Sequence, residues 1–413
     1  MRIDLALALL ALSAGALPAQ RTINVSPDGP VRSIAAALKS APRHGRIIVK
    51  AGIYRENTTI VVDKPVELVG EGWPVIDGQS ARQIMTVTAD SVTVRGLHFE
   101  HVGTSFIEDW AALKLSNVTA CRIEDNRFDD AFFGIYLSRV SNCIIRANTL
   151  HSGRGREMTS GNGIHLWNST RITIADNRIS GHRDGIYFEF VHNSVISGNV
   201  SERNIRYGLH FMYSDDCRYL SNIFRANGSG VAVMFTHRME MTGNRFEENW
   251  GGAAYGLLLK EISDSKLEGN VFYRNTTGLL ADGANRLRAD RNEFIDNGWA
   301  VKLEASTQDG RFTRNNFVGN TFDISSNNSE HTTTFAGNFW DSYEGYDLDH
   351  NGFGDVPYRP VRLFSMIVAQ NSPAIILLRS PFVHLLDTAE RLLPILTPEF
   401  LVDSAPAMRR IGS

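Results

Sequence analysis

Short apolar and polar segments alternate along most of the chain and recur at a fixed period. One column is an asparagine followed two residues later by an apolar side chain, with Asn199/Ser201 as the variant member. A second column begins with glycine, as in GIYL at Gly134 and GLHF at Gly208. The spacing between the two columns stays nearly constant, and both repeat mostly every 22 or 23 residues. This indicates a repeated structural unit. The asparagine column comprises Asn126/Phe128, Asn148/Leu150, Asn177/Ile179, Asn222/Phe224, Asn244/Phe246, Asn270/Phe272, Asn292/Phe294, Asn315/Phe317 and Asn338/Trp340.

A unit of this length, made of short β-rich segments and Gly/Asn turns, cannot bury its own apolar face, so neighbouring units must stack. We therefore predict an all-β fold: a right-handed parallel β-helix over residues 21–340, with three strands in each coil of about 22 residues. Stacked asparagine side chains would bond the backbone of the turns. The pattern RSIAAALKSA at residues 32–41 predicts a helix that covers the N-terminal edge.

Alternation along the strands predicts which side chains face outward. Counting from each glycine, positions one and three are apolar and are predicted to face inward, so positions two and four face outward. Met239 and Met241 occupy inward positions where other coils have isoleucine, so we expect them to fill the core. The three cysteines, Cys121, Cys143 and Cys217, are likewise expected to be buried thiols without redox activity.

The outward positions give a candidate metal site. Successive coils lie about 4.8 Å apart, so Met212 and Met234 would be neighbours, with His210 one outward position away. Thioether and imidazole groups are ligands that suit Cu(I), whereas Ca²⁺ prefers oxygen. The candidate Cu(I) ligands are therefore His210, Met212 and Met234, with His165 in the histidine column and His237 at a turn. The alternative is that this face packs under a loop or a partner protein.

The composition of the chain argues against a nucleic-acid-binding protein and against a fold held by disulfides. The chain has 413 residues, is 43% hydrophobic and carries a net charge of −3, without a polybasic region for nucleic acid. Three cysteines are too few for a disulfide framework. Residues 1–20 run from Arg2 through a short apolar stretch to Ala14 and Ala16, which predicts a cleaved signal peptide and an exported, periplasmic protein.

The loop predicted at residues 341–360 contains a calcium-like spacing. Asp and Asn residues follow the D-x-D-x-N-G pattern, and a main-chain carbonyl adds a further candidate ligand. Tyr358 stands where a strict EF-hand has Glu, and an Asp/Asn/Gly turn without metal is the alternative. The candidate Ca²⁺ ligands are Asp347, Asp349, Asn351, Phe353 and Asp355.

Residues 361–413 predict an apolar, helical tail. Pro373, Arg379, Pro381 and Pro394 interrupt it, which argues against a transmembrane span. We expect the tail to cap the C-terminal end of the solenoid and to dock on a membrane protein. The candidate docking residues are Leu363, Phe364, Ile375, Ile376, Leu377, Leu378, Phe382, Leu385 and Leu386.

Two segments carry a resemblance to known families. SIAAALKSAPRHGRIIVKAGIYRENTTIVVDKPVELVGEGWPVIDG resembles the N-terminal cap and first coils of pectin-lyase-like β-helix proteins. The tail from NFWDSYEGYDLDHNGFGDVPYRPV to LTPEFLVD resembles the NosD family, the periplasmic components of NosDFY ABC-transporter systems. This resemblance implies a role in assembling the copper centres of nitrous oxide reductase in denitrifying bacteria. It implies as partners the ATPase NosF, the membrane subunit NosY, the copper lipoprotein NosL and the reductase NosZ.

Three functions therefore remain open at this point. The first is copper handling, with ATP hydrolysed by another subunit because this chain has no G-x-x-x-x-G-K-[ST] motif. The second keeps the same transporter but delivers a sulfur species for the copper–sulfide cluster. The third is a carbohydrate-active enzyme such as a uronan lyase or epimerase, with a base at His165 or His210. Its carboxylates would be Asp184, Glu189, Asp215 and Asp216, but we find no run of aromatic and basic residues organised as sugar subsites. We expect that the chain is not an enzyme.

Overall fold

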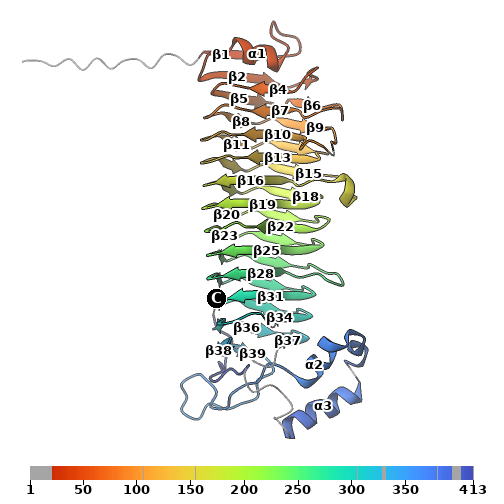
Figure 1. Cartoon of the computed structure of the whole chain (residues 1–413), viewed down its shortest axis with the longest axis vertical. Coiled ribbons are helices and arrows are strands. Elements are labelled where there is room, and N and C mark those ends of the chain that lie inside the picture. The colour runs from red at the N-terminus through yellow and green to blue at the C-terminus, as the bar shows by residue number, and fades with distance from the viewer. Residues whose placement is uncertain are drawn as a thin grey trace, which may run out of the picture.

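The computed structural model describes residues 21–105, 107–153, 155–304, 306–327, 332–378, 380–392 and 401–412. The predicted signal peptide lies outside these residues. Within them the chain winds into a parallel β-helix whose coils stack along one long axis (Figure 1). The strands form three sheets of 14, 12 and 13 strands in this part of the chain. The predicted three-strand coil and parallel β-helix are confirmed.

The 14-stranded sheet holds the strands that precede the asparagine column. It comprises β1 (Thr22–Val25), β2 (Gly45–Lys50), β5 (Val66–Glu71), β8 (Thr93–Arg95), β11 (Arg122–Glu124), β14 (Ile144–Arg146), β17 (Thr173–Ala175), β20 (Val195–Ser197), β23 (Arg218–Leu220), β26 (Glu240–Thr242), β29 (Lys266–Glu268), β32 (Arg288–Asp290), β35 (Arg311–Thr313) and β38 (Thr334–Ala336).

The 13-stranded sheet holds the strands that follow the asparagine column. It comprises β3 (Ile53–Tyr54), β6 (Val75–Asp77), β9 (His98–Glu100), β12 (Arg127–Asp129), β15 (Thr149–His151), β18 (Arg178–Ser180), β21 (Val200–Glu202), β24 (Ile223–Arg225), β27 (Arg245–Glu247), β30 (Val271–Tyr273), β33 (Glu293–Ile295), β36 (Asn316–Val318) and β39 (Phe339–Trp340).

The 12-stranded sheet holds the strands of the glycine column. It comprises β4 (Ile60–Val62), β7 (Met85–Val87), β10 (Ala111–Ser116), β13 (Phe133–Ser138), β16 (Ile164–Thr170), β19 (Asp184–His192), β22 (Tyr207–Met212), β25 (Ser229–His237), β28 (Leu257–Ser263), β31 (Thr277–Asn285), β34 (Trp299–Leu303) and β37 (Phe322–Ser326).

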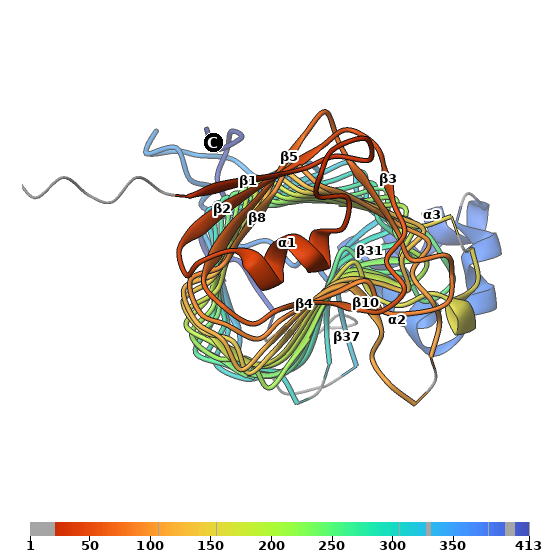
Figure 2. The same ribbon diagram turned by 90° about the horizontal axis from the view of Figure 1, so that it is seen from above.

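The predicted N-terminal helix is α1 (Ile34–Ser40), which lies across the open end of the solenoid (Figure 2). Ser33 caps it by accepting a hydrogen bond from the Ala36 amide, and Glu56 accepts bonds from the Ser33 hydroxyl and the Ile34 amide. Ile34 and Leu38 are buried in the main core. The helix therefore covers strand edges and core residues that would otherwise meet water.

The asparagine column forms a continuous ladder inside the turns. In each coil the backbone amide and Nδ2 of one asparagine donate to the Oδ1 of the next, as from Asn222 to Asn244 at 3.0 and 2.9 Å. Nδ2 also donates to a carbonyl such as that of Ile196. Buried backbone groups at these turns thus have partners, which confirms the predicted stacking. A second ladder, not predicted, joins Asn204, Asn227, Asn249, Asn275, Asn297 and Asn320.

Stacked aromatic rings fill the core beside these ladders. Phe246, Phe272 and Phe294 stack with ring centroids 4.8 and 4.6 Å apart, and Trp340 ends the column. Met239 and Met241 are fully buried, as predicted. The three cysteines are also buried and free.

The C-terminal tail begins with α2 (Leu363–Gln370), η2 (Ser372–Leu377) and α3 (Pro381–Leu392), at the end of the solenoid opposite α1 (Figure 1). Phe364, Val368 and Val383 form a small core with Trp299 of β34 and Phe322 of β37. The helices are therefore fixed to one edge of the 12-stranded sheet. Among the described residues, no helix combines the length and apolar character needed to cross a bilayer.

Residues 401–412 depart from the predicted helical tail. They form no helix and return to the last coils, where Leu401 and Asp403 are fully buried. Asp403 pairs with Phe335 and Tyr358 through backbone bridges, and Ala407 with Phe339 and Phe353. The C-terminal end is thus closed by an extended segment as well as by helices.

Candidate functional site

The outward columns predicted for the 12-stranded sheet exist in register. His165 pairs with Tyr187 and Tyr187 with His210, while Glu189 pairs with Met212 and Met212 with Met234. The alternating residues, Leu209, Phe211, Val231 and Val233, are fully buried in the core. His210, Met212 and Met234 therefore lie on one outer face, carried by β22 and β25.

Two glycines allow these strands to pack closely. A Cβ at Gly230 would stand 2.2 Å from the carbonyl oxygen of Gly256, and one at Gly208 would stand 2.9 Å from that of Gly230. Side chains at these positions would push the coils apart. The glycine column thus sets the register that places Met212 beside Met234.

Met212 and Met234 form a half-buried pair between two charged side chains. They are cross-strand neighbours, and coils in such a sheet are spaced about 4.8 Å apart. Glu189 precedes Met212 in the column and Lys260 follows Met234. The two thioethers are therefore carried by adjacent positions of neighbouring strands on the same outer face.

His210 is more enclosed than an outward position suggests, because it is only 7% exposed. The rings of Tyr187 and Tyr207 pack against its imidazole, with centroids 5.1 and 4.9 Å away. Nε2 is buried without a hydrogen-bond partner. Nδ1 lies 3.4 Å from Arg206 Nη2 and 3.8 Å from Asp184 Oδ2.

An ion pair between a buried carboxylate and a half-buried arginine lies beside this histidine. Arg206 donates from Nε and Nη2 to the two carboxylate oxygens of Asp184, at 2.9 and 2.7 Å, and Asp184 is fully buried. Burial favours the neutral acid, but hydrogen bonds from His210 and Arg206 outweigh it and hold the pKa of Asp184 below its ordinary value. The site therefore keeps a fixed negative charge beside Nδ1 of His210.

Arg206, Tyr207 and Tyr255 were not predicted from the sequence as parts of the site. The Tyr255 hydroxyl donates to that of Tyr207 at 3.3 Å, which helps to cover His210. Arg206 Nη1 also lies 3.7 Å from Glu157, in the short helix η1 (Glu157–Thr159) of the longer loop before β16. The sequence does contain one feature that could have pointed to this site. Asp184, Tyr207 and Tyr255 each immediately precede a glycine of the glycine column.

The other two predicted ligands lie apart from this group. His165 is two coils from His210, with the ring of Tyr187 between them. Asn162 Nδ2 donates to its Nδ1 at 3.0 Å, and burial together with Arg183 lowers the pKa of His165 to about 3. His237 ends β25, where its Nδ1 lies 3.2 Å from Asp215 Oδ1. The five predicted ligands therefore do not converge on one point. His210, Met212 and Met234 share one outer face of two neighbouring strands, with Met212 opposite Met234.

The calcium-like residues share one exposed loop. Asp347 accepts bonds from the backbone amides of Asn351 and Gly352, at 3.1 and 2.9 Å, and Asp355 accepts one from Leu348 at 2.7 Å. Asn351 accepts one from the Phe353 amide at 2.8 Å. These bonds are those of a self-supporting Asp/Asn turn, so a bound Ca²⁺ stays a prediction.

The predicted docking residues divide into two sets. Phe364 is 2% exposed and packs against Phe322, so it is unavailable to a partner and that prediction was wrong for this residue. Leu378 and Leu386 are half-buried against the same small core. Leu363 is also half-buried. The remaining five are exposed: Ile375, Ile376, Leu377, Phe382 and Leu385.

Sequence comparisons identify similar proteins over most of the chain. A family model described as NosD, periplasmic copper-binding protein, matches residues 152–345. A probable ABC transporter binding protein NosD from Pseudomonas aeruginosa is 31% identical over 386 residues, covering 88% of each chain. A protein of the same description from Stutzerimonas stutzeri is 27% identical over 432 residues, covering 99% of this chain and 94% of its own.

Solved structures with a similar shape share little sequence. The catalytic unit of a GH87 α-1,3-glucanase from Streptomyces thermodiastaticus strain HF3-3 has a TM-score of 0.59 at 15% identity, covering 80% of this chain and 70% of that one. PfbA, a surface adhesin of Streptococcus pneumoniae, has a TM-score of 0.55 at 12% identity, covering 79% and 92%. At such identities the likeness concerns the fold alone.

Proposed function

The chain belongs to the NosD family, and on that basis we propose that it is the periplasmic copper-handling subunit of a NosDFY-type ABC transporter. In this proposal it helps to deliver copper for assembly of nitrous oxide reductase, NosZ, and exchanges Cu(I) with the lipoprotein NosL. The chain itself catalyses no reaction, and ATP is hydrolysed by NosF. The description of the matching family as periplasmic and copper-binding supports this assignment.

The observation that carries the proposal is the unpartnered Nε2 of His210 on the same face as two adjacent thioethers. When the imidazole proton is on Nδ1, it faces Asp184 Oδ2 at 3.8 Å, and the lone pair of Nε2 is free for a metal. Arg206 Nη2, 3.4 Å from Nδ1, then donates to Asp184 alone. A carboxylate behind a ligating histidine is the common arrangement at metal sites. Imidazole and thioether are neutral ligands that suit Cu(I) and give up the ion readily, as transfer requires.

The tail supplies a route by which a transporter can act on this site. Its helices pack on Trp299 of β34, and β34 is three strands from β25 in the same sheet, about 14 Å at the usual coil spacing. The exposed apolar residues of η2 and α3 are the proposed contact with the membrane subunit NosY. Movement of that subunit would shift the last coils and thereby the geometry at Met234.

The ligand chemistry favours copper over a sulfur species as cargo. Thioethers carry no positive charge and no hydrogen-bond donor, so Met212 and Met234 offer nothing to an anionic sulfide. Delivery of a sulfur species by the same transporter would need a cationic site instead.

Two of the four acidic residues considered for a carbohydrate-active enzyme, Asp184 and Asp216, are held in ion pairs with arginines. Asp184 is bound by Arg206, and Asp216 accepts two bonds from Arg238 at 2.6 and 2.8 Å. These contacts hold the pKa of both carboxyl groups below their ordinary values. Neither of these two carboxyl groups is suited to donate a proton to a leaving group at neutral pH, which argues against both as the catalytic acid of such an enzyme.

The proposal is tested by anaerobic titration of the mature chain with Cu(I) against a competing chelator. We expect wild type to bind and His210→Ala/Met212→Leu/Met234→Leu to bind at least ten-fold more weakly. Met239→Leu/Met241→Leu is the matched control, because it removes two thioethers that are buried in the core. Equal binding by the triple variant, or loss of binding in the control alone, would refute the site.

A further inference from the structure

A second group of metal-ligating side chains lies on the outer face of the 13-stranded sheet, near the N-terminal end. Asp77, Glu100, Asp129 and His151 follow one another in register on β6, β9, β12 and β15. Three carboxylates on consecutive strands repel one another unless positive charge lies between them. The column therefore needs counter-charges, and the residues around it supply imidazoles.

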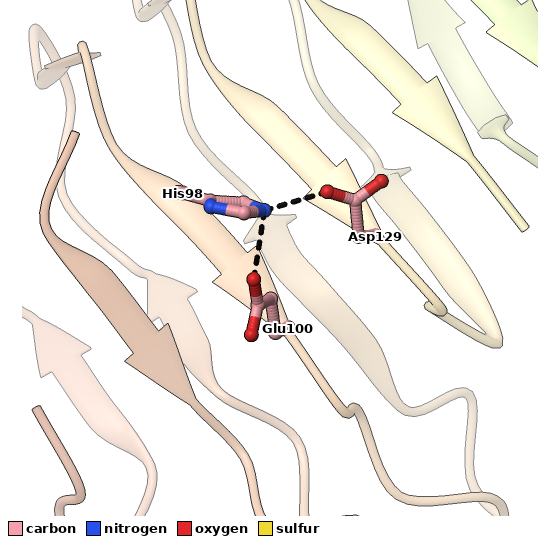
Figure 3. Close-up of side chains that lie close together, drawn as sticks. All are labelled: His98, Glu100 and Asp129. Atoms are coloured by element: carbon pink, nitrogen blue, oxygen red, sulfur yellow. Dashed lines mark hydrogen bonds and ion pairs between the residues drawn. The ribbon is translucent and has the colours of Figure 1, made fainter. Parts of the chain in front are cut away.

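His98, Glu100 and Asp129 form the centre of this group, which we call the His98 cluster. Nε2 of His98 points between the two carboxylates (Figure 3), 2.6 Å from Asp129 Oδ2 and 3.2 Å from Glu100 Oε1. One ligand atom from each residue lies within 4.8 Å of the other two. All three side chains are half-buried, so they are partly ordered by their neighbours and still reachable from solvent.

A further imidazole and carboxylate adjoin this centre. His101 follows β9, and its Nδ1 lies 3.0 Å from Asp77 Oδ1 and 4.0 Å from Glu100 Oε2. Glu100 thus has one oxygen facing each of two imidazoles. His151 continues the column next to Asp129.

The nearby guanidinium groups are directed elsewhere. Arg55 donates from Nε to Asp77 at 2.9 Å, at the outer edge of the group. Arg127, the cross-strand neighbour of His98, stacks on the ring of Trp73 with its guanidinium carbon 3.8 Å from the centroid. The centre of the His98 cluster therefore presents one nitrogen and two carboxylate oxygens, while Arg127 and Arg55 make their contacts with Trp73 and Asp77.

We propose that His98, Glu100 and Asp129 bind a divalent transition-metal cation of the Zn²⁺ class. Ligand atoms around a tetrahedral Zn²⁺ with bonds of about 2.0–2.1 Å lie about 3.3 Å apart. Nε2 of His98 lies 3.2 Å from the Glu100 oxygen and 2.6 Å from the Asp129 oxygen, so the ion would replace the close contact with Asp129. One imidazole and two carboxylates form a harder ligand set than the thioethers of β22 and β25. The site thus takes a different ion from the proposed Cu(I) site and does not depend on that proposal.

Binding at this site would join neighbouring coils. His98 and Glu100 come from β9 and Asp129 comes from β12, which lie in adjacent coils of the N-terminal half. An ion held by both strands stabilises the folded state in proportion to its free concentration. The site therefore acts as a cross-link between coils that have no disulfide.

The test uses the chelator-treated mature chain and Zn²⁺ itself, followed by calorimetry and by thermal unfolding. We expect one equivalent of Zn²⁺ to bind and to raise the unfolding temperature. His98→Gln, Glu100→Gln and Asp129→Asn should each weaken binding at least ten-fold and abolish the rise. Mg²⁺, which prefers six oxygen ligands, should not compete.

The matched control is His237→Gln/Asp215→Asn, which removes another imidazole–carboxylate pair, at 3.2 Å, from a different sheet. It should bind Zn²⁺ as wild type does. Circular dichroism checks that each variant is folded, and the near-isosteric Glu100→Gln keeps the test valid if another variant is not. The inference is overturned if wild type binds no Zn²⁺, if the control loses binding equally, or if folded Glu100→Gln binds like wild type.

Discussion

Asp403 continues the asparagine ladder beyond its last member, Asn338. Its Oδ2 accepts bonds from the backbone amide and from Nδ2 of Asn338, at 3.0 and 2.9 Å, just as each asparagine Oδ1 does for the one before it. The same carboxylate accepts bonds from Trp340 Nε1 and the Gly337 amide. A residue 65 positions away in the sequence thus terminates the repeat.

Replacing Asp403 by Ala should destabilise the protein strongly. The change leaves buried donors of Asn338 and Trp340 without acceptors, and each such group costs about 1–3 kcal/mol. We expect the free energy of unfolding to fall by about 2–4 kcal/mol in urea denaturation. Asp403→Asn keeps one acceptor oxygen and should cost less. Equal stability of wild type and Asp403→Ala would contradict the capping role.

Much of this architecture is predictable from the sequence because it repeats. Met241 lies three residues before Asn244, a position predicted to face the core, whereas Met212 lies four residues after Gly208, a position predicted to face outward. In the structure Met241 is fully buried and Met212 lies on the outer face. The second ladder was missed although its members follow the first by five residues, as Asn227 follows Asn222. Because its members recur with the same spacing as the first ladder, the second ladder was predictable from the sequence.

Features made by contacts between unlike positions could not be predicted in the same way. Asp403 lies outside the repeat, and no period links it to Asn338. The cover over His210 depends on Arg206 and Tyr207 from the turn before β22, whose side-chain directions the repeat does not fix. The His98 cluster joins β9, whose coil has Leu97 where later coils have a column asparagine, to β12, which follows Asn126 at the start of the column, so the repeat did not align the two strands.

The two classes of methionine should differ in their effect on stability. Met241→Ala removes a fully buried side chain and leaves a cavity, which typically costs about 2–5 kcal/mol. Met212→Ala removes a half-buried side chain from the outer face and should cost about 1 kcal/mol or less. Urea unfolding of the metal-free variants checks this. Similar losses for both would refute the inside/outside assignment.

Stability at the tail junction should depend on pH through Asp323. Burial, with Asp341 nearby, raises the pKa of this carboxyl from 3.8 to about 7, against the opposing effect of Arg362. Between pH 4 and pH 7 the Asp323 carboxyl keeps its proton in the folded state but has lost it in the unfolded state. The free energy of unfolding therefore falls as the pH rises from about 4 to about 7, and it is constant above about pH 7. At about 1.4 kcal/mol for each pKa unit, the loss is at most about 4 kcal/mol.

Asp323→Asn removes this titration and should flatten the fall. In urea denaturation, we expect Asp323→Asn to have a higher midpoint than wild type at pH 8. Near pH 4 the two midpoints should differ little. A wild-type profile that is level between pH 4 and pH 7, or one that Asp323→Asn leaves unchanged, would show that the carboxyl is ionised in the fold.

The exposed apolar residues of the tail should be needed for assembly and not for folding. Ile376 and Leu385 are 87% and 66% exposed, so Ile376→Asp and Leu385→Asp should leave the unfolding temperature of the isolated chain nearly unchanged. Both should abolish co-purification with NosY, the membrane subunit proposed as the partner. Phe364→Ala, which opens the small core beneath, should instead lower the unfolding temperature. Normal assembly by both Asp variants would refute the docking surface.

X-ray absorption of the Cu(I)-loaded mature chain identifies the atoms bound to the ion. We predict two sulfur neighbours and one imidazole nitrogen, because Met212, Met234 and the free Nε2 of His210 share one face. Met212→Leu/Met234→Leu should remove both sulfur neighbours, while Met239→Leu/Met241→Leu should keep them. A spectrum with nitrogen and oxygen neighbours alone, or sulfur that persists in Met212→Leu/Met234→Leu, would contradict the account.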